Sequence, residues 1–248
     1  MDKKEYLAAI SKQRKIQSVL NNIFIWSRMA VLSLVEIERN RNLLEGFSSF
    51  PVPSKTPNKL VNRNVDAIID TLVKARTSDI YKSLVVYIVS LVEPVLMEIV
   101  RLTLLYDKRR AKTKPKGCDG RLDYDTILEC IDYDEVMAIL ISRHIETLSY
   151  SKPSDQLEYI EKILSISIDD DLWKNWIEIK ATRDLIVHNS CIINKVYLDK
   201  AGDKARGELN KPIIIDEDYY KHVIIESKSL IGQLVSRLTK KEKQINDM

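Results

Sequence analysis

The chain has 248 residues and a formal net charge of +3, with 45% hydrophobic and 30% charged residues. These proportions are ordinary for a soluble globular protein, and the length is enough to bury a substantial core. The small net charge does not by itself indicate a nucleic-acid partner, so any basic surface must be local. Only six glycines are present. Because sheet-rich folds use glycine in many turns, this scarcity predicts long helices and an all-α fold.

Cysteine usage and the N-terminal stretch both predict a cytoplasmic protein. The three cysteines, Cys118, Cys130 and Cys191, are widely spaced and form no CxxC pair, which fits reduced thiols. Their spacing matches no zinc site, so we expect neither a metal nor another cofactor. The stretch MDKKEYLAAISKQRK carries charges and lacks the apolar core of a signal peptide.

Residues 3–45 are expected to form one long helix or two collinear helices. Apolar residues recur there every three or four positions, and Gly46 suits the position after a helix end. The stretch 47–58 holds three prolines and three serines, which predicts a loop. We therefore divide the chain into an N-terminal helical extension, residues 1–50, and a helical domain, residues 59–246.

A helix over about 61–73 precedes a longer helix over 79–107, which is apolar nearly all round and is expected to form the buried centre. Ser78 or Thr77, just before the longer helix, is expected to cap it. Pro94 is expected to kink the helix, and Glu93 beside it needs a cationic or backbone donor. The longest uncharged run is about ten residues. A membrane-spanning helix needs about 20, so we expect no membrane.

Residues 107–121 form a strongly basic loop. Its candidate RNA-contacting residues are Lys108, Arg109, Arg110, Lys112, Lys114 and Lys116. Two interpretations are open for this loop. It is either a solvated surface loop or an arm that contacts phosphates.

The second half of the chain predicts further short and medium helices. They are expected over about 123–131, 132–149, 153–164, 172–188 and 216–243. Three consecutive aspartates at 169–171 suit the positive N-terminal end of the fourth of these helices. A metal-binding acid cluster is the alternative interpretation.

The fourth helix ends in EIKATRDLIVHN, residues 178–189, which holds the strongest candidate site. Arg183 and His188 have four residues between them, and on a helix of about 3.6 residues per turn they point about 140° apart. Asp184 shares a face with His188, where it can accept a hydrogen bond from the imidazole and raise the histidine pKa. A long arginine, a helix that frays at Asn189, or a second subunit can bring the pair together.

An arginine and a histidine without metal ligands or a nucleophile triad have one natural chemistry. His188 acts as general base or acid, and Arg183 neutralises charge on a phosphoryl oxygen. In RNA the 2′-hydroxyl can then attack the adjacent phosphate. The alternative is a structural salt bridge and cap at a helix end, because two residues at this spacing occur by chance in many chains.

With its flanks, WKNWIEIKATRDLIVHNSCIINKVYL, this stretch resembles the HEPN superfamily, including its RiboL-PSP-HEPN-like and toxin-type ribonuclease groups. Arg183, Asp184 and His188 fit the family's frame of arginine, polar residue and histidine. The segment YIVSLVEPVLMEIVRLTLL resembles the family's apolar helix with an embedded glutamate, here Glu93. The resemblance covers roughly residues 78–238.

The resemblance implies an all-α bundle of the HEPN type with an extra N-terminal helical segment. It also implies a homodimer in which two copies of Arg183 and His188 meet in a composite cleft. Many members are metal-independent endoribonucleases of toxin–antitoxin or antiviral defence systems, so the implied partners are RNA and an antitoxin or defence-system protein. Asp184 and Asn189 would orient the pair. Residue 190 is Ser, so the His-x-Tyr extension of the adenylylated toxins is absent.

Three functions from different classes stay open. The first is the endoribonuclease just described. The second is a non-catalytic helical dimerisation or interaction module that binds a partner protein or a nucleotide. The third is a nucleotide or second-messenger binder that uses Arg183 and the basic loop.

Overall fold

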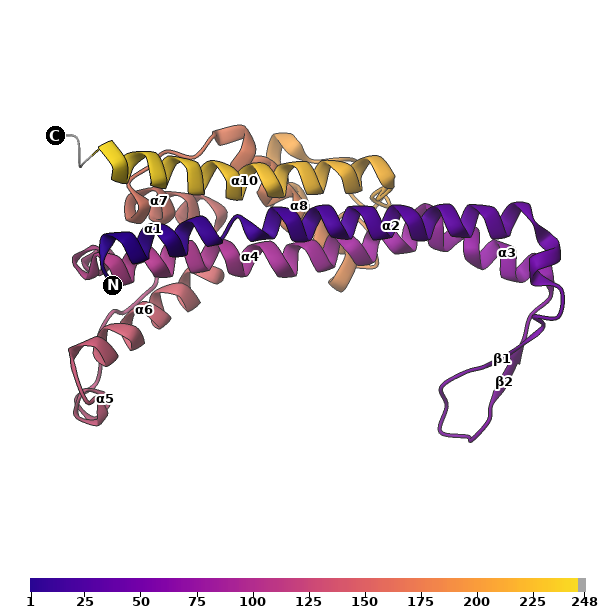
Figure 1. Cartoon of the computed structure of the whole chain (residues 1–248), viewed down its shortest axis with the longest axis horizontal. Helices are drawn as coiled ribbons and strands as arrows, with labels where there is room; N and C mark the ends of the chain where they lie inside the picture. Colours follow the sequence, from indigo (N-terminus) through magenta and orange to yellow (C-terminus); the bar gives the residue numbers. More distant parts are fainter. Residues whose placement is uncertain (245–248) are drawn as a thin grey trace.

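The computed structural model describes residues 1–244, and the all-α prediction is confirmed for that part of the chain. Its α-helices are α1 (Lys3–Lys12), α2 (Lys15–Arg39), α3 (Val65–Lys74), α4 (Ile80–Tyr106), α5 (Tyr124–Glu129), α6 (Tyr133–Ser149), α7 (Pro153–Leu164), α8 (Asp170–His188), α9 (Lys195–Ala201) and α10 (Glu217–Gln244). Single turns of other helix types lie at Arg41–Leu44, Ala75–Asp79, Lys108–Lys112 and Gly202–Lys204. Figure 1 shows an elongated bundle in which the long helices run side by side.

Helices α1 and α2 follow each other along one line, as the periodicity predicted (Figure 1). They share one hydrophobic core with α4, α8 and α10, to which they contribute Tyr6 and Leu20. Tyr6 stacks on Tyr106 of α4 with ring centroids 4.3 Å apart, and its hydroxyl is 3.0 Å from Thr103 Oγ1. The extension up to Val31 is therefore packed into the bundle. Its end, with Leu44, packs against α3 in a second, smaller hydrophobic cluster.

The far end of the molecule carries a hairpin that the sequence did not reveal. Strands β1 (Ser49–Pro51) and β2 (Leu60–Asn62) pair antiparallel, with Phe50 opposite Val61, inside and beside the stretch predicted as a loop. Pro51 can lie in this strand because each strand of a two-stranded ribbon has a free edge, where a backbone N–H is not needed. Gly46 adopts φ +90° after a 3₁₀ turn and not directly after α2, which ends earlier than predicted.

Helices α3 and α4 are joined by a π turn into one continuous helical rod, which corrects the expected hydroxyl cap between them. Asp79, just before α4, has helical dihedral angles and makes no side-chain cap. The hydroxyl of Thr77 instead bonds back to the carbonyl of Val73 at 2.7 Å. No capping residue is needed there because the chain does not leave the helical conformation.

Helix α4 is the buried centre, as predicted. It contacts α1, α2, α6, α7, α8 and α10, and Ile88, Leu96 and Val100 along it are fully buried. Pro94 lies inside the helix. The position of α4 therefore sets the position of every other long helix.

Two helical stretches, Lys3–Arg39 and Val65–Tyr106, are long and apolar enough to cross a membrane by length and composition alone. Half of the apolar window of the second stretch is buried in the bundle, but only 22% of that of the first. Core helices of soluble proteins pass the same test, so this observation is weak. That the protein needs no membrane stays a prediction.

Replacing Leu20 by Ala tests whether the N-terminal helices fold with the rest. Leu20 is fully buried in the common core, so its truncation should lower the free energy of unfolding by about 2–5 kcal/mol. Urea unfolding followed by circular dichroism should show a single shifted transition. Leu32→Ala, on the same helix but 47% exposed, is the control and should change little. A second transition that leaves the main one unmoved would contradict the shared core.

Candidate functional site around the C-terminal end of α8

Helix α8 is fixed at its N-terminal end by the three aspartates that precede or open it. The carboxylate of Asp169 accepts a hydrogen bond from the backbone N–H three residues later, at 3.1 Å. Asp170 pairs with Lys174 at 2.9 Å and Asp171 with Lys204 at 3.0 Å. These contacts agree with the capping and helix-dipole interpretation. Among residues 1–244 no group of three or more His, Cys, Asp or Glu side chains is placed to hold a metal ion.

The middle of α8 holds a buried carboxylate, Glu178, which is only 2% exposed. Its Oε1 accepts hydrogen bonds from Thr182 Oγ1 at 2.7 Å and from the Tyr197 hydroxyl at 2.9 Å. Arg206 Nε donates to the same oxygen at 2.9 Å, and the Tyr219 hydroxyl donates to Oε2 at 2.9 Å. A buried charge is costly unless it is paired and hydrogen-bonded. These five residues, the Glu178 cluster, therefore hold one another in place.

Arg206 connects the Glu178 cluster to the long connection between α9 and α10. Its guanidinium carbon lies 3.4 Å from the ring centroid of Tyr219, a cation–π contact. Its Nη1 donates to the carbonyl of Ile214 at 2.8 Å, and its backbone N–H donates to the Tyr197 hydroxyl at 2.9 Å. One arginine thus ties together α8, α9, α10 and the segment between α9 and α10.

The two tyrosines of the cluster are held in their neutral, donating form. Burial, and then the charge of Glu178, raise the pKa of Tyr197 to about 12. The same two causes raise the pKa of Tyr219 well above its usual value. Both phenols therefore remain hydrogen-bond donors to the carboxylate at neutral pH.

Glu93 of α4 has a cationic partner, as we expected from the sequence. Lys180 Nζ of α8 donates to its Oε1 at 2.5 Å, and both side chains are about a quarter exposed or less. The pair lies at the edge of the core and not deep within it. It fastens α8 to the central helix one turn before the predicted Arg–His pair.

The structure places His188 at a pocket beside α8, and Arg183 is not among the residues that line that pocket. The half-buried Arg183 donates from Nη1 to Asp184 Oδ1 at 3.0 Å. Lys200 of α9 donates to the other Asp184 oxygen at 3.1 Å. Asp184 is thus bonded to two cations, and such charge-assisted hydrogen bonds are the stronger ones. Arg183 Nε is buried and has no partner among the described residues.

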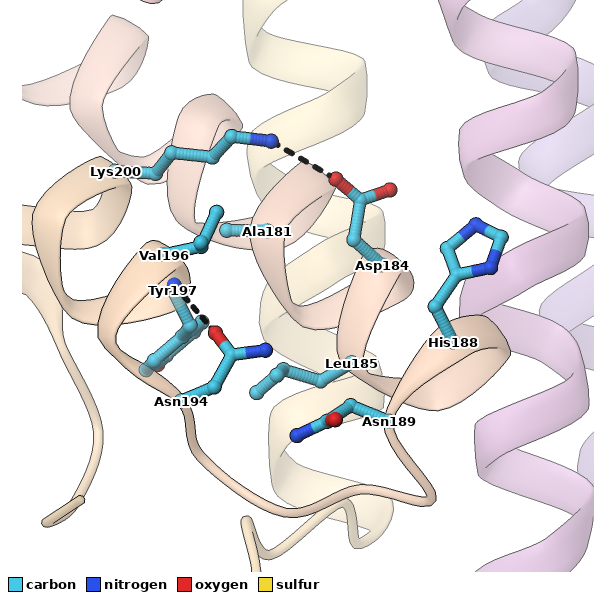
Figure 2. Close-up of a pocket in the computed structure, with 9 residues that line it drawn as sticks. All are labelled: Ala181, Asp184, Leu185, His188, Asn189, Asn194, Val196, Tyr197 and Lys200. Carbon is cyan, nitrogen blue, oxygen red and sulfur yellow. Dashed lines mark hydrogen bonds and ion pairs between the residues drawn. The ribbon is translucent and has the colours of Figure 1, made fainter. Parts of the chain in front are cut away.

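His188 is the last residue of α8, and its exposed imidazole lies at the rim of a pocket of about 300 Å³ between α8 and α9. The pocket is lined by Ala181, Asp184, Leu185, His188, Asn189, Asn194, Val196, Tyr197 and Lys200. Figure 2 shows Asp184 and His188 on one side of it and Lys200 reaching across from α9 to Asp184. The pocket combines apolar walls with charged and amide groups at its rim, which is the usual make-up of a small-ligand site.

Asn189 terminates α8 and shapes the turn that follows it. Its side-chain amide donates to the carbonyl of Ile192 at 2.5 Å. Ser190 and Cys191 both adopt positive φ, +50° and +62°, and the N–H of Cys191 bonds to the carbonyl of Leu185 at 3.0 Å. The amide of Asn189 is therefore committed to the turn and acts on the pair only through the position of the helix end.

The structure does not bring the basic stretch to this pocket. Arg110 donates to the carbonyl of Ile163, at the end of α7 and before α8 begins. His188 lies at the other end of α8, whose 19 residues span about 28 Å. The basic stretch and His188 are thus at opposite ends of α8.

Most cations of the basic stretch already have partners in the bundle. The pairs are Lys108–Asp134, Arg109–Asp107, Arg110–Asp107, Lys114 with the carbonyl of Asp119, and Lys116–Asp155. Lys112 is exposed. The solvated-loop interpretation gains support from these pairs, and a role in binding RNA stays a prediction.

Sequence reasoning missed the residues that position the site from outside α8. Arg206, Lys200 and Tyr219 belong to other segments of the chain, and no spacing relates them to Glu178 or Asp184. The sequence argument that a buried glutamate needs donors was made for Glu93 and was not applied to Glu178.

Comparison with known proteins finds no matching family model, curated protein or solved structure. The likeness to HEPN proteins therefore rests on the motif and flanks in the sequence.

Replacing Glu178 by Gln should destabilise the fold strongly. The substitution leaves Arg206 in the cluster without its carboxylate, which for a largely buried pair costs roughly 3 kcal/mol. The unfolding free energy measured in urea reports the loss. Glu98→Gln is the matched control, because the pair of Glu98 with Arg101 is exposed and is worth at most about 1 kcal/mol. Equal losses for the two variants would show that the cluster is unimportant.

The raised pKa of Tyr197 predicts a loss of stability at alkaline pH. Its folded-state value of about 12 exceeds its value near 10 in the unfolded chain. The stabilisation is therefore complete below pH 10 and is lost as the pH rises through 12. Tyr197→Phe should reduce the slope of unfolding free energy against pH in that window by about 1.4 kcal/mol per pH unit. An unchanged slope would contradict the assignment.

Proposed function

We propose that the protein is a metal-independent endoribonuclease of the HEPN type that acts as a homodimer. The observation that carries the proposal is the exposed imidazole of His188 at the rim of a pocket, at the end of a helix that the Glu178 cluster holds rigidly. Arg183, on the same helix, keeps guanidinium donors beyond the one it gives to Asp184. The family resemblance supplies the reaction that such a pair performs.

The homodimer is proposed because one chain keeps the two functional groups apart. Arg183 is not among the residues that line the pocket of His188. A two-fold axis beside the end of α8 would bring His188 of one copy to Arg183 of the other. Val187, which is 50% exposed next to His188, offers apolar surface for that contact.

In the proposed reaction His188 removes the proton of a ribose 2′-hydroxyl, and the 2′-oxygen forms a bond to the adjacent phosphorus. The bond from phosphorus to the 5′-oxygen breaks, and that oxygen takes up a proton from solvent water. The products are a 2′,3′-cyclic phosphate and a 5′-hydroxyl. Arg183 stabilises the charge that builds on the non-bridging oxygens.

Asp184 has a positioning role in this proposal. A carboxylate beside a phosphate is repulsive, but Arg183 and Lys200 offset its charge. Asp184 then orients the guanidinium of Arg183, while Asn189 fixes the turn that ends the helix. The lysine also adds a cation to the side of the pocket where a phosphate would lie.

The remaining expectations belong to the same proposal. An RNA that extends from the pocket along α8 would reach the basic stretch, where Lys112 is exposed. An antitoxin or another defence-system protein is the proposed partner, and the cytoplasm is the proposed location.

Cleavage of RNA in EDTA tests the proposal. The wild type should produce cyclic-phosphate ends, and His188→Ala and Arg183→Ala should each lower the rate by about 10²–10⁴-fold, the usual contribution of a general acid or base. His222→Ala, which removes a part-exposed histidine of α10, is the matched control and should cut like the wild type. Mixing the two inactive variants should restore part of the activity, because one of the two composite sites is then intact.

Equal cutting by wild type and His188→Ala, or no cutting by either, would disprove the catalytic role. The binding-module alternative is favoured by the ion pairs of Asp184 with Arg183 and Lys200, which need no reaction to explain them. It predicts that His188→Ala changes the dimer population in size-exclusion chromatography with light scattering and alters no nuclease activity. Thermal-shift measurements with nucleotides test the nucleotide-binder alternative, because a ligand of the folded state raises the melting temperature.

A further inference from the structure

Helix α2 carries a row of apolar side chains that no described part of the chain covers. Ile25, Met29 and Leu32 follow one another at helical spacing and are 60%, 60% and 47% exposed. Trp26, 50% exposed, widens the row on the side of α4, and Ile225 of α10, 58% exposed, widens it on the other. These five residues are the α2 face. Contiguous exposed apolar surface of this kind marks an interaction site more often than single exposed residues do.

The α2 face contains a groove where α2 and α10 run side by side (Figure 1). The groove has a volume of about 400 Å³, and its apolar walls are Phe24, Ile25, Ile224 and Ile225. A second hollow of about 280 Å³, beside Trp26, lies between α2 and the start of α4. Helix α2 is thus a ridge between two hollows, which is the surface that another helix packs against.

The charge around the α2 face is mostly positive. Asp79, which lines the second hollow, is paired with Lys74 and Lys82. The sequence contains no Asp or Glu between Lys15 and Val35. Within the part of the chain that the structure describes, Lys228 at the rim of the groove is bonded only to a neutral amide oxygen, that of Asn21, at 2.7 Å. Arg14, about two turns of α2 before the groove, donates to the hydroxyl of Ser236 at 2.7 Å.

The acids that pair with Lys221, a residue of the groove wall, are already neutralised. Glu217 and Asp218, in the first turn of α10, pair with Arg28 and Lys221. Among residues 1–244, Arg14 and Lys228 therefore have no acidic partner. A partner that supplies carboxylates would meet complementary charge.

We propose that the α2 face binds an amphipathic helix of a partner protein, with an apolar stripe bordered by glutamates or aspartates. Ile25, Met29 and Leu32 have the spacing with which a helix presents its apolar side to another helix. A second copy of this chain fits less well, because pairing two α2 faces would place cations against cations. This inference does not depend on the proposed ribonuclease activity.

The direct test uses a synthetic helical peptide with a leucine stripe bordered by glutamates, and a second peptide with lysines in place of the glutamates. Trp26 reports binding, since Trp173 and Trp176 are only 3% and 1% exposed and should not respond. The acidic peptide should shift the Trp26 emission to the blue in a saturable way. At low salt it should bind at least about tenfold more tightly than the lysine peptide.

Two substitutions then locate the peptide on the α2 face. Ile25→Ser should weaken binding of the acidic peptide about tenfold or more, because a buried aliphatic anchor is lost. Lys228→Glu should move the preference toward the lysine peptide. Ile131→Ser, at a site 92% exposed away from α2 and α10, is the matched control and should bind like the wild type. Unchanged melting temperatures would show that the three variants are folded.

Four results would overturn the proposal. They are the absence of saturable binding of the acidic peptide, equal affinity for the two peptides, binding that ignores Ile25→Ser, and a change of oligomeric state in Ile25→Ser. The last would show instead that the α2 face joins two copies of the chain. Anionic vesicles are a separate arm. Binding to vesicles that Ile25→Ser abolishes, without binding of the peptide, would assign the face to a membrane surface and would also reject the proposal.

Discussion

The buried carboxylate of Glu178 is the constraint on which the candidate site depends. Its charge requires donors, and Thr182, Tyr197, Arg206 and Tyr219 provide them from α8, α9, the connection after α9 and α10. Removing any one donor leaves the others around an undersatisfied charge. The network therefore behaves as a unit, and it orders the segments around the last turns of α8 while their surface remains open to solvent.

The two ends of α8 have opposite characters. The N-terminal end is capped and paired through its aspartates, and the lysine at its middle is tied to α4 through Glu93. The C-terminal end carries exposed side chains on a helix that the Glu178 cluster and the Glu93–Lys180 pair hold against its neighbours. Basic residues gather near the other end of the helix, where most of them are paired with acids or carbonyl groups.

Helix α2 packs one side against the bundle and leaves apolar side chains exposed on another. Helix α2 buries Ile16, Leu20, Ile23 and Val31 against the bundle, while the apolar residues of the α2 face point outward. Packing on α3, α4 and α10 covers one side of α2, and its middle turns carry further apolar residues on the open side. The α2 face and the pocket of His188 involve different helices, so a partner on one need not block the other.

The sequence by itself determined the helical class, the central α4, the need of Glu93 for a cation and the helix that ends at His188. These features depend on local periodicity and on the cost of burying a charge, both of which are readable along the chain. Only the tertiary structure decided that Arg206 and Tyr219 complete the Glu178 cluster. The same holds for the ion pair of Asp184 with Lys200 and for the position of the basic stretch at the opposite end of α8 from His188. Those outcomes depend on how loops bring distant segments together, and no spacing in the sequence encodes the distance between residues on different helices.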